Sequence, residues 1–442
     1  MPTLRTHSRS SALHVLHVSA EDGVGGAGRA ALRLHQSLEG LPEDAGVRST
    51  MLVARRTSDD PCVHMIERSL PTRTVARSVQ RLSAQVRRLH RTTNSAPRST
   101  ALIPSLAHRR IEKLDPDVVL LHWLGNRALS IRQIGRLLSG DRAVAWVLHD
   151  TWPFCGAEHY PDGNDDLRFV EGYLPGNRPS GDAGVDLNRH VWRQKRRRWS
   201  RSAQLIAPSN WIAEQARRSA LMSDWPVQVI PNPIDVVWWG SSTRAEARRS
   251  LGLPMHRQMV LFGADGGASN PRKGADLLRA ALPAMTAGLA AAGHGVPDVV
   301  MFGGAPGVGT VGGAPTRSVG RLTDVELRRF YTAADVVVVP SRQDNLPQVA
   351  VEATVCGTPV VAFDIGGQSD IVEDGVTGRL VAPFSTDRLA DSIVWVLEDA
   401  GRHARLSMAC RMTASRWEPS RIARAVTDLM TRRAREERRC AR

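Results

Sequence analysis

The chain has 442 residues, of which 42% are hydrophobic and 23% are charged, and this length predicts two or three domains with sizeable cores. The composition excludes a largely disordered chain, a collagen-like repeat and a small disulfide scaffold. Basic residues outnumber acidic ones by 59 to 44, which gives a formal net charge of +15 and favours anionic partners such as phosphates or a membrane surface.

The sequence also bears on compartment and on partners. No apolar run approaches the roughly 18 residues that a membrane span needs, and the polar N-terminus lacks the apolar core of a signal peptide. Five scattered cysteines without a CxxC pair indicate reduced thiols. We therefore expect a cytoplasmic protein. A location at the inner face of the cell membrane is an alternative. Nucleic acid is not expected as a partner, because no reading helix or aromatic stacking platform is recognisable.

The first half alternates between predicted strands and helices. An apolar run at residues 14–19 precedes a glycine-rich turn, and residues 27–38 then have the apolar periodicity of a helix. Further strands are predicted at residues 47–54, 117–122, 143–149, 204–207 and 227–230. Continuous apolar strands separated by helices indicate an α/β fold, with a parallel sheet covered on both faces.

The same pattern restarts after Pro231-Asn232-Pro233, which breaks the chain. Strands are predicted at residues 259–263, 298–302, 335–339 and 359–363, and a C-terminal helix at 417–430. We expect Rossmann-like domains at residues 1–235 and 236–415, followed at 416–442 by a helix and a basic tail that frays from Arg432.

An arginine-rich insertion occupies residues 70–112 of the first half. A solvated helix and loop is the plainer interpretation. The alternative is a surface for an anionic membrane or for a lipid-linked substrate.

Residues 23–28 read Gly-Val-Gly-Gly-Ala-Gly, which is the G-x-G-x-x-G pattern between a strand and a helix. Glycines let the backbone approach an anion closely at a helix N-terminus. A dinucleotide site also needs an acid about 20 positions further on, but here the second strand ends in Arg55-Arg56. An NADP site and a tight turn without a ligand both remain open.

Two carboxylates mark the second half. Asp344 follows the strand at 335–339, and Glu352 lies on a helix that is predicted to begin near Pro347. Both would face the crevice at the carboxyl ends of the strands, where the amides of Leu346 and Gln348 would point at an anion. The carboxylates could accept hydrogen bonds from hydroxyl groups, and the helix N-terminus could bind phosphate. A nucleotide sugar carries both kinds of group.

Residues 340–363, with their Cys-Gly-Thr-Pro-Val-Val-Ala tail, resemble the E-x7-E signature of glycosyltransferase family 4, whose members have the GT-B fold. Asp344 and Glu352 have the signature's separation, with aspartate in the first place. The resemblance implies that Glu352 binds the nucleotide ribose and that Asp344 binds the donor sugar. Asn345 and Leu346, between the two acids, are expected in the same donor site.

Other segments extend the resemblance. Residues 261–278 are similar to the family element whose basic residues hold the diphosphate, which implies this role for Arg272 and Lys273, although Ala264 replaces the usual arginine. Gly25 and Gly26 match the loop that approaches the reacting centre. His149, in a segment that resembles a bacterial polysaccharide subgroup, is expected to face the cleft.

The resemblance implies two facing Rossmann-like domains and a retaining transfer of sugar from a nucleotide-sugar donor to a glycan or lipid-linked acceptor, in cell-surface polysaccharide or glycoconjugate biosynthesis. No Asp-x-Asp motif stands out, so we expect no cofactor and a metal-independent site. By analogy, the C-terminal helix would cross back to the first domain. The alternatives are a catalytically silent GT-B protein that binds sugar nucleotides, or an NADP-dependent enzyme.

Overall fold

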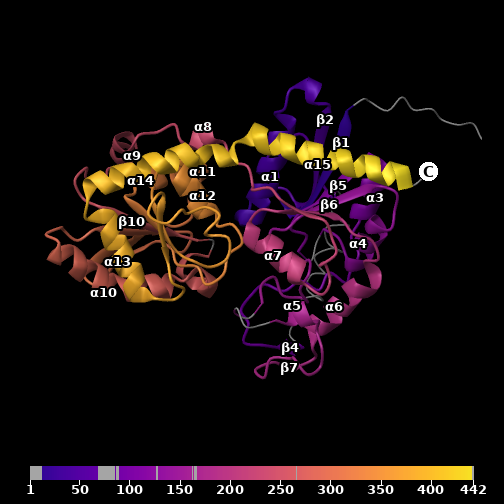
Figure 1. Ribbon diagram of the computed structural model, residues 1–442, viewed down its shortest axis with the longest axis horizontal. Coiled ribbons are helices and arrows are strands. Elements are labelled where there is room, and N and C mark those ends of the chain that lie inside the picture. The colour runs from indigo at the N-terminus through magenta and orange to yellow at the C-terminus, as the bar shows by residue number, and fades with distance from the viewer. Residues whose placement is uncertain are drawn as a thin grey trace, which may run out of the picture.

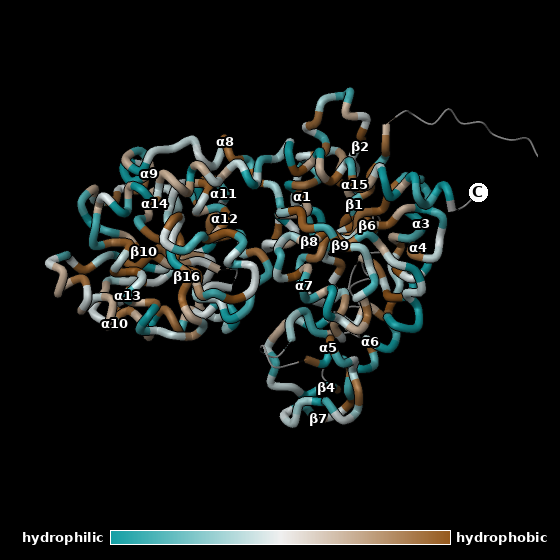
Figure 2. The backbone as a smooth tube through the Cα atoms, viewed as in Figure 1, coloured by the Kyte–Doolittle hydropathy of each residue, from teal (hydrophilic) through white to brown (hydrophobic). Residues whose placement is uncertain are grey.

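The computed structural model describes residues 12–67, 85, 89–125, 128–161, 163, 167–264 and 266–440. These residues form two α/β lobes, and one long helix runs from the second lobe across the first (Figure 1). Apolar residues gather inside each lobe and polar residues lie mostly outside (Figure 2). No helix in the described ranges is both long and apolar enough to cross a membrane.

The first lobe is built on a parallel sheet in the order β3-β2-β1-β5-β6-β8-β9. Its central strands are buried on both faces, as their continuous apolar sequences predict. The strands are β1 (Leu13–Glu21), β2 (Val47–Arg55), β3 (Val63–Met65), β5 (Val118–Leu121), β6 (Ala143–Val147), β8 (Gln204–Ala207) and β9 (Val227–Val229).

Helices cover this sheet and confirm the predicted alternation. The helix predicted at residues 27–38 is α1 (Gly25–Glu39), and its apolar face, including Leu34 and Leu38, is buried. The other helices of this lobe are α3 (Ala107–Leu114), α4 (Ile131–Leu138), α5 (Arg168–Glu171), α6 (Leu187–Arg198) and α7 (Asn210–Arg218).

The second lobe repeats the plan with the strand order β12-β13-β11-β10-β14-β15-β16. The sequence patterns missed the antiparallel pair β12–β13 at one edge, because β12 is glycine-rich and exposed and lacks an apolar face. The strands are β10 (Met259–Gly263), β11 (Asp298–Phe302), β12 (Gly307–Val311), β13 (Ala314–Ser318), β14 (Val336–Val339), β15 (Val360–Phe363) and β16 (Gly378–Val381).

Helices also flank the second sheet. The helix expected near Pro347 is α12 (Gln348–Val355), and Pro347 itself is its N-cap. Two short helices after the Pro231-Asn232-Pro233 break lead into this lobe. The helices are α8 (Val236–Trp239), α9 (Arg244–Ser250), α10 (Ala275–Ala291), α11 (Asp324–Ala333), α12, α13 (Thr386–Leu397) and α14 (Ala400–Thr413). The expected domain boundary at residues 235 and 236 stays a prediction.

The C-terminal helix α15 (Pro419–Cys440) crosses from the second lobe to the first and packs on α1 and β6 (Figure 1). Its apolar side, with Val426 and Met430, is buried. The expected fraying from Arg432 is wrong as far as Cys440, because arginines fix the helix to the first lobe. Arg433 donates a hydrogen bond to the Ser202 carbonyl, and Arg438 pairs with Asp117 at 2.7 Å.

Residues 70–84 and 86–88 of the arginine-rich insertion lie outside the described residues, and its two interpretations stay predictions. The described remainder includes β4 (His90–Arg91), which pairs with β7 (Ala183–Gly184), and the helix α3.

Met430→Ala tests the crossing helix. Met430 is fully buried, so removing its side chain should destabilise the protein by about 2–5 kcal/mol. Met412→Ala on α14 is the control, because Met412 is 74% exposed and its loss should change stability by less than about 0.5 kcal/mol. Urea unfolding monitored by tryptophan fluorescence measures both. Equal effects would contradict the packing of α15 on the first lobe.

Candidate active site

The glycine turn of the first lobe faces the start of α12 in the second. Gly25 has a φ of +65°, a conformation that favours glycine, and it opens helix α1. A Cβ atom at Gly26 would lie 3.7 Å from Cγ of Gln348, the first residue of α12. The structure therefore brings together the two segments that the sequence singled out in separate halves.

Asp344 lies buried in the loop between β14 and α12 and is held by both predicted basic residues. Lys273 forms an ion pair with Oδ2, and Nη1 of Arg272 lies 3.6 Å from Oδ1. Arg272 also stacks over the Tyr160 ring of the first lobe at 4.3 Å. Burial disfavours the charged carboxylate, but Lys273 and Arg272 outweigh it and lower the pKa of Asp344 below its ordinary value. The site thus holds an ionised carboxylate beside two cations.

Glu352 is only 1% exposed and is clasped by two arginines of α1. Its Oε1 accepts hydrogen bonds from Arg33 at 2.8 Å and from Arg29 at 3.2 Å, while Oε2 accepts one from the Tyr331 hydroxyl at 3.1 Å. Both arginines also pair with Asp324 at the start of α11. The carboxylate expected to bind ribose is therefore occupied by side chains of the opposite lobe.

Asn345 bridges the lobes through its side-chain amide. Its Nδ2 donates to the carbonyls of Leu148 and His149 at 2.7 and 3.1 Å, and its Oδ1 accepts from the Ser209 hydroxyl at 2.7 Å. The Leu346 side chain instead belongs to the buried apolar core. Asn345 thus fixes the loop of Asp344 against the end of β6.

His149 ends a row of three imidazoles, of which His17 lies in β1 and is buried, His122 follows β5 and is buried, and His149 follows β6 and is partly buried. Its Nε2 lies 3.0 Å from Nδ1 of His122, whose Nε2 lies 2.9 Å from Nδ1 of His17. Burial lowers the pKa of His149 to about 4 and holds the pKa of the other two well below the usual range. The three rings are therefore neutral at physiological pH, and two hydrogen bonds join them through the central His122.

A cavity of about 240 Å³ lies between the lobes, and Gln343, the sequence neighbour of Asp344, is part of its lining. Trp211, Gln215 and Arg218 of α7 line one side, and Gln343 and Ile365 of the second lobe line the other. An indole face, an amide and a guanidinium would suit a polar, hydroxyl-bearing ligand.

Among the described residues, the one cluster of potential metal ligands within 4.8 Å of one another is His35, Glu39 and Asp60, which does not include the cleft carboxylates. Asp344 and Glu352 are instead neutralised by the chain's own cations. The expectation of a donor site without metal stays a prediction.

Sequence reasoning missed Arg29 and Arg33 as partners of Glu352. A signal was present, since the two arginines are one helical turn apart on α1, just after the glycine turn. The facing carboxylate, however, is more than 300 residues away along the chain, and no local pattern connects them.

Two family models match the chain, "Glycosyltransferase Family 4" over residues 24–238 and "Glycosyl transferases group 1" over residues 314–412. Among curated proteins, a D-inositol 3-phosphate glycosyltransferase of Actinosynnema mirum is 36% identical over 208 residues, which cover 43% of this chain and 48% of that protein. A D-inositol 3-phosphate glycosyltransferase of Nocardia farcinica is 33% identical over 295 residues, which cover 61% of this chain and 59% of that protein. The chain spans about half the length of the curated relatives it matches first.

Solved structures share the fold at low sequence identity. Sucrose-phosphate synthase of Thermosynechococcus elongatus superposes with a TM-score of 0.63 at 17% identity, covering 95% of this chain and 98% of that one. The HepE protein of Anabaena in complex with UDP-glucose superposes with a TM-score of 0.61 at 17% identity, and the match covers 95% of this chain and 99% of that one. The chain has two facing lobes built on parallel sheets, and the two family models together match more than half of it. Together with these relatives, the two matches show that the protein belongs to glycosyltransferase family 4 and has the GT-B fold.

Proposed function

We propose that this protein is a glycosyltransferase that moves a sugar from a nucleotide-sugar donor to a hydroxyl acceptor with retention of anomeric configuration. The observation that carries the proposal is the convergence of Asp344, its two cations and Glu352 beside the glycine turn of the opposite lobe. This arrangement supplies anionic groups for hydroxyls and cationic groups for phosphates within one crevice.

The donor would lie along the start of α12. Glu352 would accept hydrogen bonds from the ribose hydroxyls, and Asp344 from the sugar. The α12 N-terminus and the loop at Asn345 and Leu346 would take the phosphates. Because Arg29 and Arg33 occupy Glu352 in this structure, ribose would have to replace them.

In the transfer, the acceptor oxygen forms a bond to the anomeric carbon while the bond from that carbon to the diphosphate oxygen breaks. The acceptor's proton passes to the departing diphosphate on the same face of the sugar. Lys273 and Arg272 would stabilise the negative charge that develops on this leaving group, and no metal would be needed. His149, neutral and hydrogen-bonded to His122, would position rather than protonate the substrate.

The acceptor would enter the cavity lined by Trp211, Arg218 and Gln343. Trp211 offers an apolar face to a sugar ring, and Arg218 would favour an acceptor with a negative charge. We propose a glycan or lipid-linked acceptor of cell-surface polysaccharide or glycoconjugate synthesis, with the arginine-rich insertion contacting an anionic membrane at its cytoplasmic face. Inositol 3-phosphate belongs in the acceptor panel, because it appears in the names of the curated relatives.

Lys273→Ala should lower kcat for sugar transfer by about 10²–10³-fold, since it removes a fixed charge beside the leaving group. Glu352→Ala should abolish most transfer through loss of the ribose contact. Lys113→Ala is the control, because this lysine is exposed on α3 and should leave the rate unchanged. Near-normal rates in both site variants, with the fold intact by circular dichroism, would disprove the site assignment.

The donor class is tested by thermal shift with UDP, GDP, ADP, dTDP, their common sugars and NADP. Selective stabilisation by one nucleoside diphosphate is expected, because ligand that binds only the folded state raises its stability. UDP-glucose is the first probe, since the Anabaena neighbour was solved with it. Stabilisation by NADP alone would contradict the proposal, and donor binding without hydrolysis or transfer would favour the catalytically silent alternative.

The exchange of arginine for ribose predicts a coupling that depends on nucleotide. A double-mutant cycle with Arg33→Gln and Glu352→Gln should give a coupling of about 1–3 kcal/mol in urea unfolding without nucleotide, and less when donor is bound. The exposed pair of Arg342 and Asp276 is the matched control, expected to couple by less than about 1 kcal/mol in either condition. An unchanged coupling at Glu352 with donor bound would rule out its role with ribose.

A further inference from the structure

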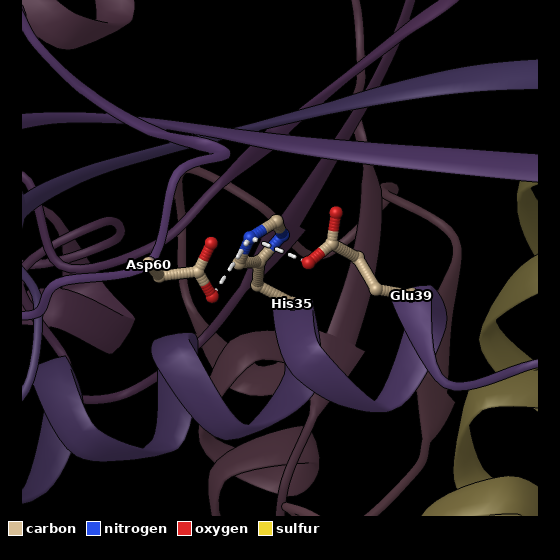
Figure 3. Close-up of side chains that lie close together, drawn as sticks. All are labelled: His35, Glu39 and Asp60. Carbon is tan, nitrogen blue, oxygen red and sulfur yellow. Dashed lines mark ion pairs between the residues drawn. The ribbon is translucent and has the colours of Figure 1, made fainter.

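A second polar cluster lies in the first lobe, away from the cleft residues, where the end of α1 meets the loop between β2 and β3. His35 and Glu39 are one helical turn apart on α1, and Asp60 approaches the same imidazole from the loop (Figure 3). The proposed sugar transfer uses none of these side chains.

The imidazole of His35 is fully buried, yet its Nε2 makes no hydrogen bond. Nε2 lies 3.5 Å from Oε2 of Glu39 and 3.7 Å from Oδ2 of Asp60. A hydrogen bond between such groups would measure about 2.7–3.0 Å, so these separations are too long for one. The ring instead faces two carboxylates across a gap.

Two of the three separations across the gap suit a tetrahedral metal ion. Bonds of about 2.0–2.1 Å to nitrogen and oxygen place neighbouring ligand atoms roughly 3.3–3.5 Å apart around zinc. The two distances from Nε2 are close to this value, and all three ligand atoms lie within 4.8 Å of one another.

The surroundings orient each ligand. His35 Nδ1 lies 2.7 Å from the buried Ser49 hydroxyl, and with the ring proton on Nδ1 the Nε2 lone pair points at the carboxylates. Oδ1 of Asp60 accepts a hydrogen bond from the Cys62 amide, which leaves Oδ2 for the ion. In that tautomer, a cation between the Nε2 lone pair and the two carboxylates would relieve their mutual repulsion.

We infer that His35, Glu39 and Asp60 form a divalent metal site for an ion of the zinc class, which fastens the β2–β3 loop to the end of α1. An imidazole ligand favours zinc over magnesium or calcium, which prefer oxygen ligands alone. The inference does not depend on the proposed sugar transfer, because the site lies at the end of α1 opposite the glycine turn.

The test is calorimetric titration of ZnCl₂ into the full chain, expressed without added histidines and stripped of metal with a chelator. One equivalent of zinc should bind and raise the melting temperature, whereas MgCl₂ should do neither. Asp60→Asn and Glu39→Gln keep the shape of each side chain and should weaken zinc binding by at least about tenfold.

Glu112→Gln is the matched control. Glu112 pairs with His108 on α3 at the same spacing of four residues. Among the described residues no third potential ligand joins this pair, so zinc binding should be unchanged. Circular dichroism of the metal-free variants checks that each is folded. The site is disproved if the unaltered chain binds no stoichiometric zinc, if both ligand variants bind it as tightly, or if magnesium binds equally well.

Discussion

The relation between the two lobes depends on a carboxylate that has been removed from water. Glu352 is almost completely buried, and an unpaired charge in that position would cost several kcal/mol. Its compensating cations lie on α1 of the other lobe, so these ion pairs form only when the lobes are together. The same contact brings the glycine turn at the start of α1 against the first turn of α12, and the crevice that we propose for the donor is formed there.

Polar groups also make the other contacts across the crevice. Asn345 hydrogen-bonds backbone and side-chain groups of the first lobe, and Arg272 stacks on Tyr160 while it pairs with Asp344. A ligand with hydroxyl and phosphate groups can replace such contacts one for one, whereas a dry apolar interface would offer it nothing. The crevice is thus held closed by the kinds of interaction that a nucleotide sugar would make.

Helix α1 links the parts of this arrangement. Its first turns carry the glycines and the two arginines of the crevice, and its last two turns carry His35 and Glu39. The helix also packs against α15. A metal ion at that end would fix the helix to the β2–β3 loop, while α15 fixes it to the body of the lobe. The helix would then be held rigidly enough to keep Arg29 and Arg33 in a fixed position relative to Glu352.

The sequence by itself determined the two β/α lobes, nearly every buried strand and the site segments at Gly25, Lys273 and Asp344. These are local features, because apolar runs, glycine turns and a short acidic motif are each complete within a few residues. Local patterns did not predict the exposed strand β12. They also did not predict that the C-terminal helix continues beyond Arg432. Only the tertiary structure decided that Arg29 and Arg33 meet Glu352, that His17 and His122 support His149, and that Asp60 approaches His35. These groups are distant along the chain or carry no pattern of their own, and packing of the sheets and lobes alone brings them within bonding distance.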